Sequence, residues 1–285
     1  MSEVETERLA KVLAARGIAS RREAEKMITQ GQVAVNGEVV LHPGHPVNPA
    51  KDSIRVDGQA IPAHPRLVYY LLHKPKGYIV TRSDPEGRKS VFELFPELPA
   101  RVESVGRLDI NTEGALLLTN DGDLAHRLTH PSAGVPKRYL AKVYRTPGEK
   151  TIARMEAGLD LEDGRTAPCK VRVVSATEKE NAWVEITVTE GRNRLVRRIF
   201  AAVGHPVAKL VRQSFATLSI RGLERGQFRS LSGEEVERLR EIAGGTPATV
   251  AGQRPRAAKE GFAKPNPDWV KKRVAGNKKR AMKRG

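Results

Sequence analysis

The hydrophobic pattern of the first 60 residues predicts two short helices followed by a β-hairpin. Apolar residues at helical spacing begin near Glu7 and end at Gly17, a residue type that often ends helices. A second helix is predicted to begin after Ser20, because Glu23 three residues later completes a capping box. The dipeptide Asn36-Gly37 then separates two short β-rich runs, which is a strong signal of a hairpin. This order of elements predicts a small α/β module.

The pattern also divides the rest of the chain. A proline-rich stretch over 41–66 contains one expected strand over 53–56 and ends the first module as a linker. The run LVYYLLHKP, which begins at Leu67, predicts a buried strand and opens a second domain that continues to Ala243. Apolar and aromatic residues then become sparse, which predicts a disordered tail. The expected domains are 7–66, 67–243 and 244–285.

Composition is typical of a soluble globular protein. Hydrophobic residues make up 39% and charged residues 29% of the 285, and no apolar run is long enough to span a membrane. The acidic first ten residues lack the apolar core of a secretory signal, so a cytoplasmic location is expected. Cys169 is the single cysteine, which excludes an internal disulfide, and the seven histidines form no metal-ligand spacing with it. We therefore expect no bound metal.

The charge indicates a polyanionic partner. Lys and Arg number 50 against 33 Asp and Glu, which gives a net charge of +17. Residues 244–285 contribute twelve basic and two acidic side chains, so the tail carries +10 and the remainder +7. Nucleic-acid phosphates attract such surfaces and release counterions on binding. A tail that only increases solubility is the alternative, and a membrane-surface role is less favoured because the tail has no apolar face.

The stretch VGRLDINTEGALLLTNDGDLAHRLTHP, residues 105–131, contains the strongest candidate for chemistry. Residues 115–119 form an apolar run that predicts a strand, residues 120–122 predict a turn, and Leu124 and Leu128 lie on one side of a predicted helix. Asp109 therefore lies in a loop just before a buried strand, a common place for catalytic groups. By itself, such an aspartate is more often a turn or capping residue.

Two resemblances change that interpretation. The stretch RLAKVLAARGIASRREAEKMITQGQVAVNGEVV resembles the S4 domain, a small RNA-binding module. Residues 106–114, GRLDINTEG, resemble the G-R-L-D-x-x-T-x-G motif of pseudouridine synthases, whose invariant aspartate corresponds to Asp109. In S4 domains the paired helices contact RNA backbone, which implies RNA contacts for Arg21, Arg22 and Lys26. The alternative for these three is a simply solvated helix face.

Three further stretches resemble pseudouridine synthase motifs in the expected order. Residues 74–78, KPKGY, resemble the K-P-x-G motif, and residues 137–139, KRY, resemble a motif whose tyrosine lies under the target base. Residues 190–200, EGRNRLVRRIF, resemble a third motif, from which the resemblance implies that Arg197 pairs with Asp109. Leu195 departs from the Gln or Glu common in relatives, which puts only a local contact in doubt. Leu210 resembles an apolar residue that packs on the base.

Together these resemblances imply an RNA-modifying enzyme over residues 7–243. The implied fold is α/β (α+β), with a mixed, largely antiparallel central sheet and a separate N-terminal S4-like module. Asp109, Tyr139 and Arg197 are the implied catalytic residues. The residues expected to contact RNA are Arg21, Arg22, Lys26, Arg107, Arg192, Arg194 and Arg198. For the arginines between Glu190 and Arg212, a simple phosphate-binding stripe is the alternative. A tyrosine at the start of a strand, such as Tyr139, is by itself more often a core residue.

Within the family, the S4 module and the EGRNR and KRY stretches resemble the RsuA/RluB branch. Residues 84–88, DPEGR, and the basic tail look most like the large-subunit enzymes of that branch, so the expected substrate is a stem-loop of 23S ribosomal RNA. Small-subunit ribosomal RNA and transfer RNA are alternatives, as is a non-catalytic RNA-binding assembly factor. The chain is expected to act as a monomer and to use no cofactor.

The implied reaction breaks the C1′–N1 bond of a uridine, rotates the base and rejoins it through C5. It needs a carboxylate, expected at Asp109, that stays ionised in a pocket shielded from water. Tyr139 would supply a ring on which the base stacks and a hydroxyl that could relay a proton. The sequence leaves open whether Asp109 attacks the base, attacks the sugar or removes the C2′ proton.

Overall fold

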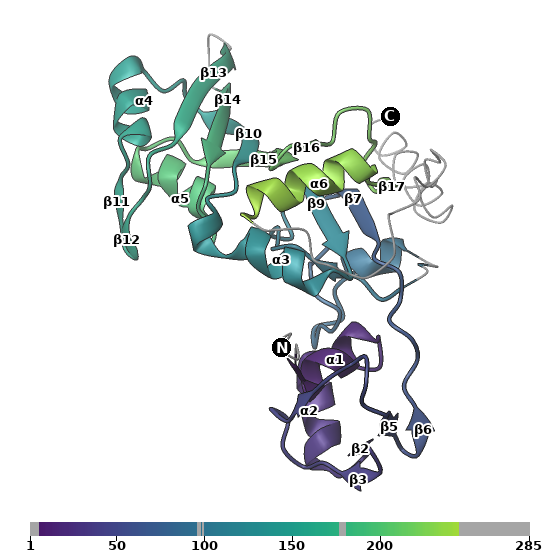
Figure 1. Ribbon diagram of the computed structural model, residues 1–285. Helices are drawn as coiled ribbons and strands as arrows, with labels where there is room; N and C mark the ends of the chain where they lie inside the picture. Colours follow the sequence, from purple (N-terminus) through teal and green to yellow (C-terminus); the bar gives the residue numbers. More distant parts are fainter. Residues whose placement is uncertain (1–5, 96–97, 99, 177–180, 245–285) are drawn as a thin grey trace. The chain divides into compact units, whose positions relative to one another are not determined.

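The computed structural model describes residues 6–95, 98, 100–176 and 181–244. These residues divide into two compact units between Val68 and Tyr69 (Figure 1). Residues 6–68, with 100–101 and 120–122, form the first unit, and the other described residues form the second. From residue 245 onward, the expected basic tail lies outside the described residues. No helix in the described ranges has the length and apolar character needed to cross a membrane.

The first unit contains two helices and a small antiparallel sheet. Its helices are α1 (Leu9–Ala15) and α2 (Arg21–Thr29). Its strands are β1 (Glu7–Arg8), β2 (Val33–Val35), β3 (Glu38–Val39), β4 (Pro46–Val47), β5 (Ile54–Val56) and β6 (Gln59–Ala60). In the described residues, β3-β2-β5-β6 form one sheet and β1 pairs with β4. Apolar side chains of both helices and of the sheet form a common core, including Leu9, Leu13 and Ile28.

Local sequence signals explain this unit. The Glu23 amide donates to Ser20 Oγ at 3.2 Å and the Ser20 amide donates to Glu23 Oε2 at 2.8 Å, so the predicted capping box is confirmed. Such a cap stabilises a helix by about 1 kcal/mol. Asn36 and Gly37 both have positive φ, 52° and 92°, as a tight two-residue hairpin turn requires. The helix α2 buries Ala24 and Ile28, and this leaves its basic residues exposed.

The second unit is built on a mixed sheet. Its long strands are β7 (Tyr69–Lys74), β9 (Thr112–Thr119), β10 (Lys137–Tyr144), β13 (Lys170–Ala176), β14 (Asn181–Val188) and β15 (Val207–Phe215). Shorter strands are β8 (Glu103–Ser104), β16 (Leu218–Ser219) and β17 (Phe228–Ser230), and β11 (Asp160–Leu161) and β12 (Gly164–Arg165) form a separate hairpin. In the described residues the main order is β13-β14-β10-β15-β9-β7-β17, with β9 and β15 parallel and the other pairs antiparallel. The expected fold class is therefore confirmed.

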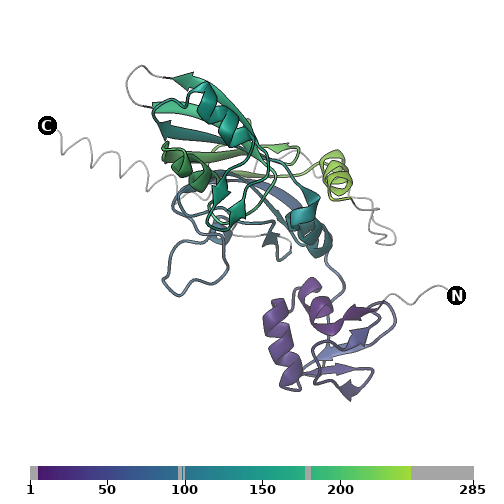
Figure 2. The same ribbon diagram turned by 90° about the vertical axis from the view of Figure 1, so that its left-hand side faces the viewer.

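Helices cover this sheet at two places. The helices α4 (Glu149–Glu156) and α5 (Leu195–Ala202) lie beside the β13–β14–β10 half, and α3 (Gly122–Thr129) and α6 (Gly233–Ile242) beside the β9–β7 half (Figures 1 and 2). Short 3-10 helices lie at Val91–Leu94 and Pro131–Ala133. The helix α5 buries four apolar residues in a core with β10, β14 and β15. Leu124 and Leu128 are both buried, as their spacing predicted.

Candidate active site

A cleft of about 1260 Å³ lies in the second unit. Its walls come from the loop before β9, the start of β10, the end of β14, the start of α5, and β15. The charged residues that line it are Arg88, Arg107, Lys137, Arg192, Arg194 and Arg212 on the basic side and Asp109 and Glu190 on the acidic side. A cleft with this excess of basic side chains suits a nucleic-acid ligand.

Asp109 lies in the loop that leads into β9, and this loop is held in place by backbone hydrogen bonds. The Thr112 amide donates to the Asp109 carbonyl at 2.9 Å, which closes a tight turn at the start of the strand. The Gly77 amide donates to the Ile110 carbonyl at 2.8 Å. Gly77 has a φ of +89°, a conformation that glycine adopts readily. The K-P-x-G motif therefore supports the loop that carries Asp109.

Lys74 is a second support of the same loop, and sequence reasoning gave it no role. Its side chain is fully buried, and its Nζ donates to the carbonyls of Asp109 at 3.1 Å and Thr112 at 3.0 Å. Burial lowers the pKa of Lys74 to about 8, although the nearby charges of Asp109 and Glu113 oppose this shift. A lysine at the end of an otherwise apolar strand run was the available signal, because a charge is rarely buried without several partners.

The carboxylate of Asp109 forms an ion pair with Arg194, at 3.7 Å between Oδ2 and Nη1. This pair is partly exposed, with 33% of the Asp109 side chain and 52% of the Arg194 side chain accessible, so its contribution to stability is small. The resemblance implied Arg197 as the partner. Arg197 instead donates to the carbonyls of Asn111 at 3.3 Å and Val207 at 3.2 Å. The hydrogen bond to Asn111 joins α5 to the Asp109 loop.

The difference between these two arginines follows from helix geometry. Arg194 immediately precedes α5, with a φ of +48°, and is exposed, whereas Arg197 is half-buried one turn later. Burial lowers the pKa of Arg197, the charge of Arg194 lowers it further, and the charge of Asp109 raises it. Both guanidinium groups therefore act on the Asp109 loop, one through its carboxylate and one through its backbone.

Tyr139 and Leu210 lie on one face of the sheet and both line the cleft. Tyr139 on β10 is paired with Arg212 on β15, and Leu210 two residues earlier is paired with Ala141. Because side chains alternate along a strand, Tyr139 and Leu210 project from the same face of these neighbouring strands. An aromatic ring and an apolar side chain at this place can hold a flat base between them. Leu195, the departure from the family motif, is buried in the α5 core.

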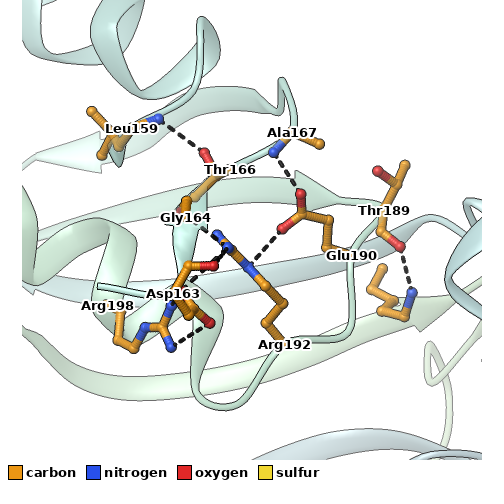
Figure 3. Close-up of polar contacts among 10 residues, drawn as sticks. Leu159, Asp163, Gly164, Thr166, Ala167, Thr189, Glu190, Arg192 and Arg198 are labelled. Carbon is orange, nitrogen blue, oxygen red and sulfur yellow. Dashed lines mark hydrogen bonds and ion pairs between the residues drawn. The ribbon is translucent and has the colours of Figure 1, made fainter. Parts of the chain in front are cut away.

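Arg192 and Arg198 are held by an acidic residue that sequence reasoning missed. Asp163, in the turn of the β11–β12 hairpin, forms ion pairs with Arg192 at 3.2 Å and with Arg198 (Figure 3). The hydrogen bonds from Arg198 and the charges of both arginines lower the pKa of Asp163. Arg192 also contacts Glu190 at 3.1 Å. These two arginines therefore order the rim of the cleft, and they are less available to phosphates than the sequence suggested.

The remaining predicted RNA contacts are exposed. Arg107 is exposed at the cleft, two residues before Asp109. Arg21, Arg22 and Lys26 are all exposed on α2 of the first unit. The second unit thus brings together Asp109, Tyr139, Arg194, Arg197 and Leu210, while the α2 residues form a separate basic surface on the first unit.

A sheet of this topology with an aspartate, a tyrosine and basic residues around one cleft defines a class of RNA-modifying enzyme. Residues 68–202 match the RNA pseudouridylate synthase family, and residues 7–59 match the S4 domain family. The chain belongs to the pseudouridine synthases of the RsuA/RluB family, which carry an S4 domain. It is an isomerase that converts uridine in RNA to pseudouridine.

Individual relatives cover most of the chain. A Bacillus subtilis protein named ribosomal large subunit pseudouridine synthase B is 45% identical over 238 residues, covering 83% of this chain and 97% of the relative. A Haemophilus influenzae protein of the same name is 40% identical, covering 84% of this chain and 69% of the relative. A solved structure described as pseudouridylate synthase aligns with a TM-score of 0.60 and 31% identity, covering 81% of this chain and 99% of that one.

Proposed function

We propose that this enzyme isomerises one uridine, or very few, in a stem-loop of large-subunit (23S) ribosomal RNA, with Asp109 as the catalytic carboxylate. The observation that carries the site assignment is that Asp109, Tyr139 and Arg194 line one basic cleft. The substrate assignment is supported by the relatives from Bacillus subtilis and Haemophilus influenzae, whose names specify the large subunit. The first of these matches 83% of this chain over 97% of its own length.

The reaction places three demands on the site. The target uridine must leave its stack, which costs a few kcal/mol and less in a loop, and it must then be held flat. Tyr139 and Leu210 offer the two apolar surfaces for this. A carboxylate must remain ionised beside the sugar and base, and Arg194 supplies a positive charge 3.7 Å from Asp109. The loop must also stay rigid, which Lys74 and Arg197 achieve through its backbone carbonyls.

Affinity for structured RNA would come from basic surfaces on both units. Arg21, Arg22 and Lys26 on α2 are exposed and available for phosphates, as is Arg107 beside the cleft. Phosphate contacts supply binding free energy that offsets the cost of unstacking the uridine. Because each unit carries a basic surface of its own, we propose a folded stem-loop as the substrate rather than a short single strand.

The decisive experiment is to delete the gene in its host and map pseudouridines chemically in all stable RNAs. We expect loss of one pseudouridine, or very few, in 23S ribosomal RNA, and restoration by a plasmid copy of the wild-type gene. Loss of a pseudouridine in small-subunit ribosomal RNA or in transfer RNA would overturn the substrate assignment. Loss of none would favour an assembly role without catalysis.

A further inference from the structure

Arg212 on β15 is a buried guanidinium beneath the active-site cleft. Only 2% of the residue is exposed, yet it lines the cleft. Its Nε donates to the Ala115 carbonyl at 2.7 Å, and its guanidinium carbon lies 5.2 Å from the centre of the Phe215 ring. Nη2 is also buried, and the described protein provides no hydrogen-bond acceptor for it. The protein therefore fixes the guanidinium through Nε, and Nη2 remains able to donate a hydrogen bond to a ligand.

The position of Arg212 on the sheet is next to the expected site of the base. In the β10–β15 pair, Arg212 lies directly opposite Tyr139. Directly opposed residues have Cβ atoms about 5 Å apart on the same face of a sheet. Leu210, two residues earlier on β15, projects from this face as well. A base packed against Tyr139 and Leu210 would therefore have its edge beside the Arg212 guanidinium.

The backbone of Arg212 is tied to the strand that follows the Asp109 loop. Strands β9 and β15 pair in parallel, and Gly114 is in register with Arg212. The two backbones approach so closely that a Cβ on Gly114 would lie 2.2 Å from the Arg212 carbonyl oxygen. The guanidinium is thus held in a fixed position relative to the loop that carries Asp109.

The charge of Arg212 is not neutralised by a neighbouring carboxylate in the described part of the chain. Within the described ranges no carboxylate lies within ion-pair distance of Arg212, whereas the buried Lys74 and the half-buried Lys137 lie close enough for their charges to interact with it. Burial, with a smaller contribution from Arg212, lowers the pKa of both Lys74 and Lys137 to about 8. An uncompensated buried cation is costly, so this region favours a ligand group that carries negative charge.

We propose that Arg212 is a further catalytic residue, whose guanidinium donates a hydrogen bond to a carbonyl oxygen of the target uracil. This inference rests on the proposed role of Asp109 in the same cleft. The hydrogen bond strengthens as negative charge develops on that oxygen, which stabilises the transition state more than the bound substrate. Uracil has two carbonyl oxygens, so the required ligand chemistry is present in the substrate.

Negative charge develops on a uracil carbonyl oxygen whether Asp109 attacks the sugar, removes the C2′ proton or attacks the base. When the C1′–N1 bond breaks, its electron pair stays on uracil and spreads from N1 to the carbonyl oxygens. The electron-deficient C1′ then gains a bond from an Asp109 oxygen, or the sugar loses its C2′ proton to Asp109 and forms a C1′–C2′ double bond. The same uracil pair then forms the C1′–C5 bond while Asp109 leaves C1′ or returns the proton to C2′. Finally the C5 proton is lost and N1 gains one. If Asp109 adds to C6 instead, the C5–C6 π pair moves onto O4. That pair then forms the C1′–C5 bond while the C1′–N1 pair stays on N1, the N1 pair expels Asp109 from C6, and the C5 proton is transferred to N1.

The test compares Arg212→Met and Arg212→Lys with the wild type under single-turnover conditions. The substrate is 23S ribosomal RNA transcribed with uridine or with 5-fluorouridine, and the C-nucleoside product is measured by mass spectrometry after digestion. Fluorine at C5 withdraws electrons and makes the uracil anion more stable, so it reduces the need for Arg212. We expect Arg212→Met to slow uridine turnover by about 100-fold, with unchanged RNA affinity. With 5-fluorouridine the loss should be several-fold smaller, and Arg212→Lys should retain an intermediate rate.

Equal losses on the two RNAs, or a loss explained by weaker RNA binding, would show that Arg212 only supports the fold. If Arg212→Met does not fold, the same comparison is made with Arg212→Lys. A larger loss of turnover on the uridine RNA than on the 5-fluorouridine RNA supports the proposal, and equal losses contradict it. Arg172→Met, which changes an exposed arginine on β13 outside the cleft, is the matched control and should behave like the wild type. Asp109→Asn measured alongside separates the two hypotheses. If it remains active, the proposed site is wrong. If it is inactive while Arg212→Met is fully active, only the role of Arg212 is wrong.

Discussion

At the scale of single residues, Asp109 combines a partly exposed carboxylate with a tightly bound backbone. Replacing it with asparagine removes the charge and the nucleophilic oxygen but little volume, and the hydrogen bonds of the Asp109 carbonyl to Lys74 and Thr112 are preserved. We expect Asp109→Asn to lower tritium release from C5-labelled uridine in RNA to below about a thousandth of wild type. Melting temperature and RNA affinity should stay nearly unchanged. Residual turnover above that level would exclude Asp109 as the catalytic group.

Lys74 leads to a prediction about pH and stability. Its pKa is about 8 in the folded protein against an ordinary value of 10.5, so the unfolded chain holds more protons between these values. The contribution of Lys74 to the free energy of unfolding therefore rises as the pH increases from 8 to 10.5. In urea denaturation, wild type should gain about 1–2 kcal/mol relative to Lys74→Met between about pH 7.5 and pH 9.5. Lys137 is present in both proteins, so its contribution to the free energy of unfolding cancels in the difference between them. A difference independent of pH would contradict the assignment.

At the scale of elements, the close parallel contact between β9 and β15 depends on Gly114. A Cβ there would lie 2.2 Å from the Arg212 carbonyl oxygen and 2.6 Å from its nitrogen, and Gly114 has a φ of +121°. We expect Gly114→Ala to lower the free energy of unfolding by about 3 kcal/mol or more and to reduce turnover with it. Gly233→Ala in α6 is the control, because its Cβ would meet open space and alanine favours helix. Similar stabilities for both variants would refute this account.

The sequence predicted contacts between residues close together in the chain, but not contacts between residues far apart in it. The capping box at Ser20, the turn at Asn36 and the helix face of Leu124 depend on neighbours within a few residues, and all three predictions are confirmed. The ion pair between Asp163 and Arg198 joins residues 35 positions apart, and Tyr139 and Arg212, which lie opposite one another, are 73 positions apart. Spacing along the chain contains no information about such contacts, so the motifs located the cleft but not the partners within it.

At the scale of the whole molecule, we expect RNA binding and chemistry to depend on different residues. Arg197 supports the Asp109 loop, whereas Arg21 and Arg22 lie exposed on the first unit. We expect Arg197→Ala to reduce turnover at saturating RNA. The double variant Arg21→Ala, Arg22→Ala should instead weaken RNA binding and reduce its salt dependence by about 0.9 log units of slope per lost phosphate contact on a duplex. Equal losses of saturated turnover in the two variants would contradict this separation.

The basic tail leads to a prediction about long-range attraction. Residues 244–285 carry a net charge of +10 and few apolar residues. We expect deletion of residues 246–285 to leave single-turnover rates intact and to lower RNA affinity, most clearly at low salt, where screening is weakest. Binding measured over a range of salt concentrations tests this expectation, together with the melting temperature of the truncated protein. A lower melting temperature would show that the tail stabilises the folded core.

The parallel pairing of β9 with β15 also sets when the enzyme becomes active during its own synthesis. Asp109 precedes one strand of the pair and Arg212 lies on the other, about one hundred residues later. At about 5–20 residues per second, a translating ribosome needs about 5–20 s to cover that interval. A nascent chain would therefore carry its S4 domain well before it held both Asp109 and Arg212, the two residues that we propose for the catalytic centre.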